Sequence, residues 1–337
     1  MPSPLVSVLL PVRDAGPHLG GCIASLESQS LSDFEVVAVD DGSVDGSGEA
    51  LDAWARRDSR VTVFHRPPEG LVAALNAGLE RCRAPLVARM DADDVCHPRR
   101  LELQAALLEA RPELGAASCL VRHVPWHGVG EGFRIYEAWL NALATPAAIA
   151  RERFVESPVA HPSAVVRREL LEGCGGYRDF GGPEDYDLWL RLLEAGVQIA
   201  KVERHLYFWR EHGDRLTRTD SRYSVENFLR VKARYLLRGP LESASAVVWG
   251  AGQTGRRLSK HLLHGDAHIT AFVDIDPAKI GRSLRGRPVV GPGELPRLLA
   301  NGAVVLAAVA SRGARAIIRE HLDGLGLLEG EGYWCVA

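Results

Sequence analysis

The sequence has no apolar run that could span a lipid bilayer. Its longest such run, residues 303–310, is far shorter than the roughly 20 residues that a transmembrane helix needs. The first residues also lack the charged stretch followed by an apolar core that marks a secretory signal peptide. We therefore expect a cytoplasmic protein without a transmembrane segment, either free or held peripherally at the inner face of a membrane.

An excess of basic residues is absent as well. The chain has 40 Lys and Arg against 43 Asp and Glu, a formal net charge of −3, whereas nucleic-acid-binding domains usually carry a basic surface. We therefore expect no nucleic-acid partner. The six cysteines are scattered, without metal-ligand spacing or the density of a disulfide scaffold, so we expect reduced thiols.

What the sequence does contain is enough apolar material for more than one core. With 337 residues and 46% hydrophobic content, two domains are expected at the usual domain size. A break near residues 238–241 precedes a new strand-turn-helix series that starts at residue 246. We place one domain over residues 1–240 and a smaller one over residues 241–337.

Short apolar runs alternate with helical patterns along the first domain. Strands are predicted near residues 5–10, 34–39, 61–64 and 86–89, with Pro11 ending the first, and helices are predicted near residues 18–29, 49–57 and 71–81. This alternation predicts an α/β fold, a mostly parallel sheet with helices on both faces. Ligands of such sheets bind beyond the carboxyl ends of the strands.

A cluster of carboxylates follows the last of these strands. Residues 89–94 read Arg-Met-Asp-Ala-Asp-Asp, and crowded carboxylates repel each other unless a cation joins them. A hard divalent ion, Mg²⁺ or Mn²⁺, takes oxygen ligands of this kind together with substrate phosphates. The alternative is a solvated acidic turn that caps the next helix.

Two further acidic segments lie at the ends of predicted elements, one after a strand and one before a helix. Residues 40–45, Asp-Asp-Gly-Ser-Val-Asp, follow a strand, where a carboxylate can accept hydrogen bonds from a base or a ribose. Glu184 and Asp185 precede an amphipathic helical pattern over residues 185–195. Locally, an ordinary Asp/Gly/Ser turn and a pair of first-turn acids explain these two segments equally well.

The ordered set is more specific than any of its members. Residues 7–13 (Ser-Val-Leu-Leu-Pro-Val-Arg), the Asp-Asp-Gly-Ser segment, the Asp-Ala-Asp-Asp segment and residues 184–191 (Glu-Asp-Tyr-Asp-Leu-Trp-Leu-Arg) resemble the motifs of the family 2 inverting glycosyltransferases, over the first two-thirds of the chain. The resemblance implies a GT-A fold and a metal-dependent transfer of sugar from a nucleotide-diphosphate-sugar donor. The acceptor would be the hydroxyl of a glycan, a lipid-linked molecule or a small molecule.

The resemblance also implies residue roles. It assigns donor nucleotide binding to Pro11, Arg13, Asp41, Arg89 and Asp91. Asp93 would be the direct ligand of Mn²⁺ or Mg²⁺, and His212 either a second ligand or a histidine of a surface loop. Asp185 matches the catalytic base, and Glu184 would raise its pKa or fix its position. Asn76 matches an asparagine on a helix beside the donor.

The C-terminal domain carries a different motif. Gly250, Gly252 and Gly255 form Gly-x-Gly-x-x-Gly after a predicted strand, and Asp274 follows about 20 residues on, as in the dinucleotide fingerprint. A Rossmann-like fold is expected, with Asp274 placed to hold a ribose. The domain would bind NAD(P) or another nucleotide, assemble a homo-oligomer, or be purely structural.

Two rival functions follow from other features. An NAD(P)-binding oxidoreductase or sensor acting on sugar nucleotides would rest on the C-terminal motif alone. A sugar nucleotidyltransferase would open with a glycine-rich loop bearing Arg and Lys, whereas residues 11–17 read Pro-Val-Arg-Asp-Ala-Gly-Pro. The several separated carboxylates at strand ends favour the glycosyltransferase.

Overall fold

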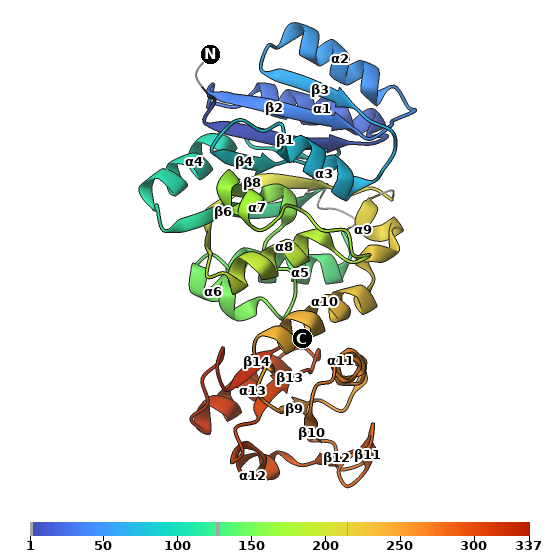
Figure 1. Cartoon of the computed structure of the whole chain (residues 1–337), viewed down its shortest axis with the longest axis vertical. Helices are drawn as coiled ribbons and strands as arrows, with labels where there is room; N and C mark the ends of the chain where they lie inside the picture. The colour runs from blue at the N-terminus through green and yellow to red at the C-terminus, as the bar shows by residue number, and fades with distance from the viewer. Residues whose placement is uncertain (1–2, 126–128, 214) are drawn as a thin grey trace. The chain divides into compact units, whose positions relative to one another are not determined.

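The computed structural model describes residues 3–125, 129–213 and 215–337. Contacts divide the chain into two compact units, each with its own β-sheet (Figure 1). The first unit comprises Met1–Ile149, Pro158–Phe180 and Arg191–Thr219, and the second comprises Ala150–Ser157, Gly181–Leu190 and Asp220–Ala337.

The first unit is built on an eight-stranded sheet with the order β3-β2-β1-β4-β7-β6-β8-β5. Its strands are β1 (Val6–Val12), β2 (Phe34–Asp40), β3 (Val61–His65), β4 (Leu86–Arg89), β5 (Val95–Cys96), β6 (Leu114–Val124), β7 (Val165–Arg167) and β8 (Gln198–Arg210). Strands β3, β2, β1 and β4 run parallel, as do β6 and β8, while β7 and β5 pair antiparallel with their neighbours. The predicted mostly parallel α/β sheet is confirmed.

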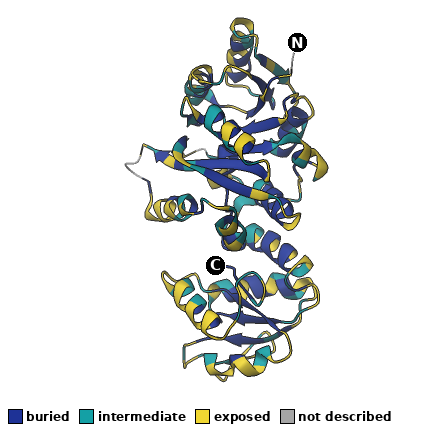
Figure 2. Ribbon diagram, turned by 90° about the vertical axis from the view of Figure 1, so that its left-hand side faces the viewer, coloured by how far each residue is buried: buried dark blue, intermediate teal, exposed yellow. Residues whose placement is uncertain are grey.

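Helices cover this sheet. They are α1 (Gly16–Glu27), α2 (Ser47–Arg57), α3 (Leu71–Leu79), α4 (Arg100–Ala110), α5 (Glu131–Ala142), α7 (Arg168–Gly173) and α9 (Leu216–Thr219), with α6 (Pro146–Glu152) and α8 (Glu184–Glu194) taking residues from both units. Strands β1, β2 and β4 are buried throughout (Figure 2), as continuous apolar runs in a covered parallel sheet should be. No helix in the described parts of the chain is both long and apolar enough to cross a membrane.

Strand β1 differs from the prediction, because it does not end at Pro11. Pro11 pairs with Val39 of β2, and the strand continues to Val12. Strand β4 pairs only with Val6–Leu9, so Pro11 lies beyond β4 and has a neighbouring strand on one side only. Proline has no N–H to donate and is tolerated at such an edge position.

The second unit contains a six-stranded sheet with the order β11-β12-β10-β9-β13-β14. Its strands and helices are α10 (Val225–Arg238), β9 (Ala246–Trp249), α11 (Gln253–His264), β10 (Ile269–Val273), β11 (Ser283–Leu284), β12 (Arg287–Val290), α12 (Leu295–Leu299), β13 (Val304–Ala307), α13 (Ala314–Gly324) and β14 (Tyr333–Cys335). All pairings are parallel except that between β11 and β12. The strand-turn-helix series predicted from residue 246 corresponds to β9 and α11.

The turn between β9 and α11 shows why two of its glycines are needed. A Cβ atom on Gly255 would lie 1.8 Å from the carbonyl oxygen of Gly250, and one on Gly250, whose φ is 124°, would lie 2.7 Å from the carbonyl oxygen of Ala308. A Cβ on Gly252 would meet no atom within 4 Å. The first and third glycines therefore permit close packing, and the second leaves open space above the backbone.

We expect Gly255→Ala to lower the free energy of unfolding by about 3 kcal/mol, because the methyl group overlaps a backbone carbonyl and α11 must move. The matched control is Gly132→Ala, in the first turn of α5, where a Cβ meets nothing within 4 Å. This control should be neutral or stabilising by about 0.5–1 kcal/mol. Urea unfolding measures both changes, and equal stabilities for the two variants would contradict the packing argument.

Candidate active site

Three loops meet at one edge of the first sheet. Strands β2, β1 and β4 are parallel neighbours, so the segments after Asp40, Val12 and Arg89 leave the sheet at the same edge. The first two segments are hydrogen-bonded to each other: Val44 N–H donates to Asp14 at 2.8 Å, and Gly16 N–H donates to Asp45 at 2.7 Å. The structure thus joins loops that are distant in sequence.

Asp41 ties these loops to the start of α3. Its side chain is almost fully buried and accepts hydrogen bonds from the backbone N–H groups of Glu69 and Gly70, each at 2.9 Å. The guanidinium of Arg13 lies 3.3 Å from the same carboxylate. Pro11 lies two residues before Arg13, in β1. Since a carboxylate offers about four acceptor positions, three are used and about one remains for a ligand.

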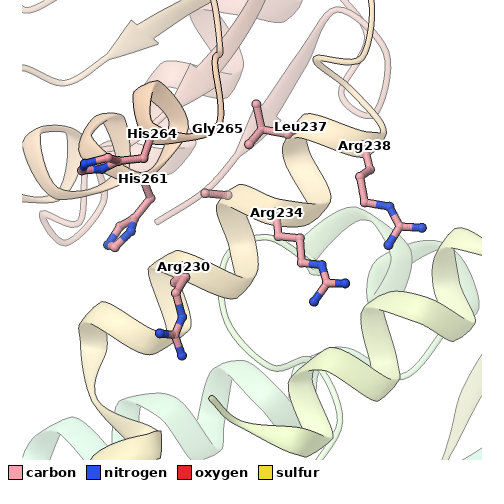
Figure 3. Close-up of a pocket in the computed structure, with 8 residues that line it drawn as sticks. Arg230, Arg234, Leu237, Arg238, His261, His264 and Gly265 are labelled. Carbon is pink, nitrogen blue, oxygen red and sulfur yellow. The ribbon is translucent and has the colours of Figure 1, made fainter. Parts of the chain in front are cut away.

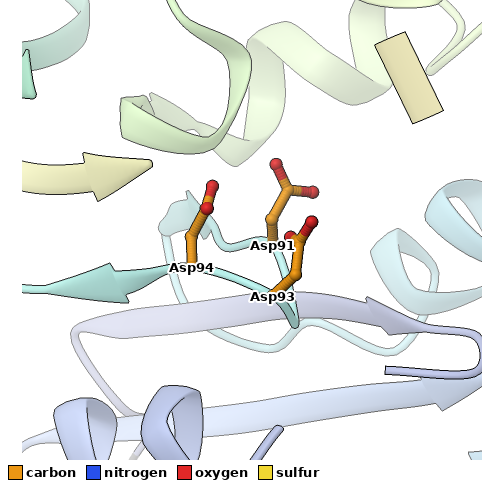
Figure 4. A group of neighbouring side chains, drawn as sticks. All are labelled: Asp91, Asp93 and Asp94. Carbon is orange, nitrogen blue, oxygen red and sulfur yellow. The ribbon is translucent and has the colours of Figure 1, made fainter. Parts of the chain in front are cut away.

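The acidic cluster follows β4. One oxygen of each of Asp91, Asp93 and Asp94 lies within 4.8 Å of the others (Figure 4). Asp91 pairs with Arg89, whose Nη2 donates to it at 2.6 Å, and Arg89 is itself buried. The close approach of three carboxylates requires compensating positive charge, and the three acids obtain it in different ways.

Asp94 is fully buried, and both of its oxygens are used. One accepts from the Tyr207 hydroxyl at 3.0 Å. The other accepts from the Arg210 backbone N–H at 2.8 Å and from Arg215 Nη1 at 2.9 Å. Burial raises the pKa of Asp94 to about 7, the negative charge of Asp93 adds to the effect, and Arg215 opposes it. Asp94 therefore anchors the end of β8 and Arg215 next to the acidic cluster.

Asp93 instead faces a histidine. His212 Nε2 lies 2.9 Å from Asp93 Oδ2, although 119 residues separate the two in sequence. The imidazole stacks on the ring of His18 at 4.5 Å between centroids, and among the described residues its buried Nδ1 has no hydrogen-bond partner. A partly exposed carboxylate beside an imidazole is a donor set that suits Mn²⁺ and related divalent ions.

Arg210 was missed by the sequence analysis, together with the structural roles of Asp94 and Arg215. Its Nε donates to the carbonyl oxygen of Asp93 at 2.7 Å, and its Nη2 donates to that of His18 at 2.6 Å. The sequence does contain a signal for these two arginines. Arg210 and Arg215 flank His212 within residues 209–217, and a buried acid needs a nearby cation.

Asn76 and His161 both contact Tyr177. The Asn76 side chain donates to the carbonyl oxygen of Tyr177 at 2.8 Å and accepts from its N–H at 2.9 Å. His161 is buried, with Nε2 3.0 Å from the Tyr177 hydroxyl. Burial lowers the pKa of His161 well below its ordinary value, and the positive charge of Arg89 adds to this. Both residues thus position Tyr177.

Glu184 and Asp185 begin α8 and belong to the second unit. Both carboxylate oxygens of the buried Glu184 accept from the Tyr223 hydroxyl, at 2.9 and 3.0 Å. Asp185 is half-buried. Desolvation raises the pKa of Asp185 to about 8, with the charge of Glu184 as the next contribution. A carboxylate of this basicity suits general base catalysis near neutral pH.

Asp274, also in the second unit, braces the turn that contains Gly250, Gly252 and Gly255. It accepts from Ala251 N–H at 2.9 Å, from Asp276 N–H at 3.0 Å and from Lys279 Nζ at 3.0 Å. Burial raises the pKa of Asp274, but these hydrogen bonds outweigh it, so the pKa lies below its usual value. Three of about four acceptor positions of Asp274 are thus occupied, the same number as at Asp41.

Sequence comparisons identify relatives of the chain. The family model described as "Glycosyl transferase family 2" matches residues 7–175. The amylovoran biosynthesis glycosyltransferase AmsE of Erwinia amylovora is 33% identical over 201 residues, covering 59% of this chain and 73% of AmsE. An uncharacterized glycosyltransferase of Bacillus subtilis, EpsJ, is 41% identical over 242 residues, covering 67% of each chain.

Solved structures resemble the fold at low sequence identity. Residues 1–349 of S. aureus TarS, in complex with UDP-GlcNAc, give a TM-score of 0.56 at 17% identity, over 76% of this chain and 71% of that one. The mannosyltransferase PcManGT of Pyrobaculum calidifontis, in complex with GDP-Man and Mn²⁺, gives a TM-score of 0.51 at 21% identity, over 79% and 70%.

Replacing Arg215 by Ala should lower the free energy of unfolding by about 3–5 kcal/mol at pH 8, because the buried Asp94 then loses its cation and must either stay charged without it or bind a proton. Burial raises the pKa of Asp94 to about 7, so the loss should be smaller at pH 6, where the carboxyl of the unmodified chain binds a proton. Urea unfolding at the two pH values measures this.

A matched control is Arg57→Ala, which breaks a surface pair with Glu27 and should change stability by at most about 1 kcal/mol. Adding Asp94→Asn to the Arg215→Ala chain should recover part of the lost stability at pH 8. If Arg215→Ala cost no more than Arg57→Ala, the buried pair would not support the site.

Proposed function

The chain belongs to glycosyl transferase family 2, and on this premise we propose which of its residues carry out the transfer. The protein is a glycosyltransferase that takes its sugar from a nucleotide-sugar donor. We propose that the donor is a nucleotide-diphosphate sugar, that the transfer inverts the anomeric carbon, and that a divalent cation assists it. The observation that supports this best is the meeting of Asp91, Asp93 and His212 beyond β4.

The donor nucleotide would lie over the loops after β1 and β2. Asp41, with about one acceptor position left, would accept a hydrogen bond from the base, and Pro11 and Arg13 would line the pocket. Arg89 fixes the carboxylate of Asp91, which would contact the ribose or the water molecules around the cation. The UDP-GlcNAc complex of TarS and the GDP-Man complex of PcManGT support a nucleoside diphosphate in this fold.

The residues present fit a divalent cation. Asp93 supplies a carboxylate oxygen and His212 an imidazole nitrogen. These two atoms lie 2.9 Å apart. Asp94 would not take part, because its oxygens hold Arg215, Arg210 and Tyr207. Bound Mn²⁺ or Mg²⁺ would offset the negative charge that develops on the departing diphosphate. The Mn²⁺ complex of PcManGT supports the same choice of ion.

Asp185 would act as the general base. It would take the proton of the acceptor hydroxyl while that oxygen bonds to the anomeric carbon and the bond from this carbon to the diphosphate breaks. Glu184, fixed by the Tyr223 hydroxyl, places a second negative charge next to Asp185 and keeps its pKa high. The acceptor remains a hydroxyl of a glycan, a lipid-linked molecule or a small molecule.

For residues 241–337 we retain a Rossmann-like domain as a proposal. The open space above Gly252 would admit a phosphate at the start of α11. We do not extend this proposal to NAD(P) chemistry, because Asp274 binds Ala251, Asp276 and Lys279 and so braces the turn itself.

We expect Asp93→Asn and His212→Ala each to weaken Mn²⁺ binding at least about tenfold, since each removes one of two protein ligands. Electron paramagnetic resonance titration with Mn²⁺ alone measures free and bound ion without a donor. Asp33→Asn, a carboxylate on an exposed loop, is the control and should bind like the unmodified chain. Equal affinities in all four proteins would refute the metal assignment.

The rate of transfer should rise with pH through about 8, because Asp185 must lose its proton before it can act as a base. Asp185→Asn should retain donor binding and lose transfer by a factor of about 10² or more. Glu184→Gln keeps an acceptor for Tyr223 but removes the neighbouring charge, so the pKa of Asp185 should fall.

The measurement is kcat as a function of pH with saturating donor and acceptor. In Glu184→Gln the rise of kcat should move to lower pH, whereas a merely structural role of Glu184 would lower kcat at every pH without moving the curve. Full transfer by Asp185→Asn would exclude Asp185 as the base.

A further inference from the structure

Helices α10 and α11 of the second unit are strongly basic, although the whole chain has a net charge of −3. Seven Lys or Arg residues lie in these two helices: Arg230, Lys232, Arg234, Arg238, Arg256, Arg257 and Lys260. Glu226 is their one acidic residue. Solvated helix faces usually alternate charges of both signs at i and i+4, so this imbalance calls for a function.

Three of these seven basic side chains, all arginines of α10, line a groove between the two helices. A cavity of about 500 Å³ is lined by residues that include Arg230, Arg234, Leu237, Arg238, His261 and His264 (Figure 3). The three arginines stand four residues apart along α10, so they share one face of that helix. The two histidines come from α11.

The floor of the groove is apolar and closely packed. A Cβ atom on Gly265 would lie 2.3 Å from Leu237 Cδ1, so the end of α11 packs against α10 and a larger residue at position 265 would require Leu237 to move. Ala233 adds a second small apolar surface. Cationic groups around an apolar floor form a concave site whose volume falls within the usual range for small ligands, about 300–1,000 Å³.

The acid of these helices pairs with one residue of the groove, His261, and with Arg257 outside it. Glu226 lies 2.6 Å from His261 and 3.6 Å from Arg257, at the beginning of α10. Within the described chain, no carboxylate forms an ion pair with the exposed Arg234. The guanidinium of Arg234 is therefore open to the solvent, and Arg238, one turn further along α10, is also exposed.

We propose that this groove binds a phosphate or diphosphate group, carried either by a soluble molecule or by a lipid. Arginine donors match phosphate oxygens in pairs, and this geometry recognises phosphate better than a single ammonium does. The site lies wholly within the second unit. It involves neither the residues assigned to sugar transfer nor the turn of Gly250–Gly255, so the proposal goes beyond the glycosyltransferase activity.

The test uses the full chain and inorganic pyrophosphate, measured by isothermal titration calorimetry with a chelator present, so that no cation recruits the pyrophosphate to Asp93. We expect a single site in the unmodified chain. Arg234→Ala combined with Arg238→Ala should weaken it at least tenfold, or about 1.4 kcal/mol. Arg282→Ala combined with Arg297→Ala removes two exposed arginines elsewhere in the unit and should leave the affinity unchanged.

Flotation with phosphatidylglycerol vesicles distinguishes the source of the phosphate. Vesicle binding that the Arg234/Arg238 double variant loses and the control double variant keeps would support a lipid-borne phosphate. Pyrophosphate binding without vesicle binding would support a soluble one. If the Arg234/Arg238 variant matched the unmodified chain in both assays, or neither probe bound, the proposal would be wrong and the helix faces merely solvated. Equal thermal unfolding of both double variants would show that the substitutions leave the fold intact.

Discussion

The arrangement of the proposed active site depends on the burial of one carboxylate, that of Asp94. A buried negative charge is costly unless cations and hydrogen-bond donors surround it, and here Arg215, Tyr207 and the backbone of Arg210 provide them. These partners bring the end of β8 to the end of β4. The same approach brings His212 to Asp93 and leaves Asp91 and Asp93 as the more exposed acids of the cluster.

Much of this arrangement could be predicted from sequence, for a simple physical reason. Apolar runs that stay buried on both faces predict parallel strands, and parallel strands bring their carboxyl ends to one edge, so the loops with Arg13, Asp41 and Asp91 were expected to meet. The different roles of Asp91, Asp93 and Asp94 could not be predicted, because the three look alike in a one-dimensional pattern. Only the course of β8 decides which of them becomes buried.

Two other positions show how an outcome depends on partners that the local pattern does not reveal. Pro11 appears to end a strand, yet β1 continues because its neighbour β4 has already ended on that side. Asp274 matches the acid of the dinucleotide fingerprint, but its carboxylate binds Ala251 N–H and Lys279. In both cases the outcome depends on a partner that comes from elsewhere in the chain. The glycine at position 255, by contrast, is required by a contact inside the motif itself, with the carbonyl oxygen of Gly250.

The link between Asp94 and Arg215 spans 121 residues, and this separation bears on how the protein is made. While a ribosome is still adding residues between β4 and β8, the acidic cluster has neither His212 nor its buried cation. A nascent chain therefore lacks the complete donor set until almost the whole first unit has emerged. Premature capture of metal by a half-made enzyme is thereby disfavoured.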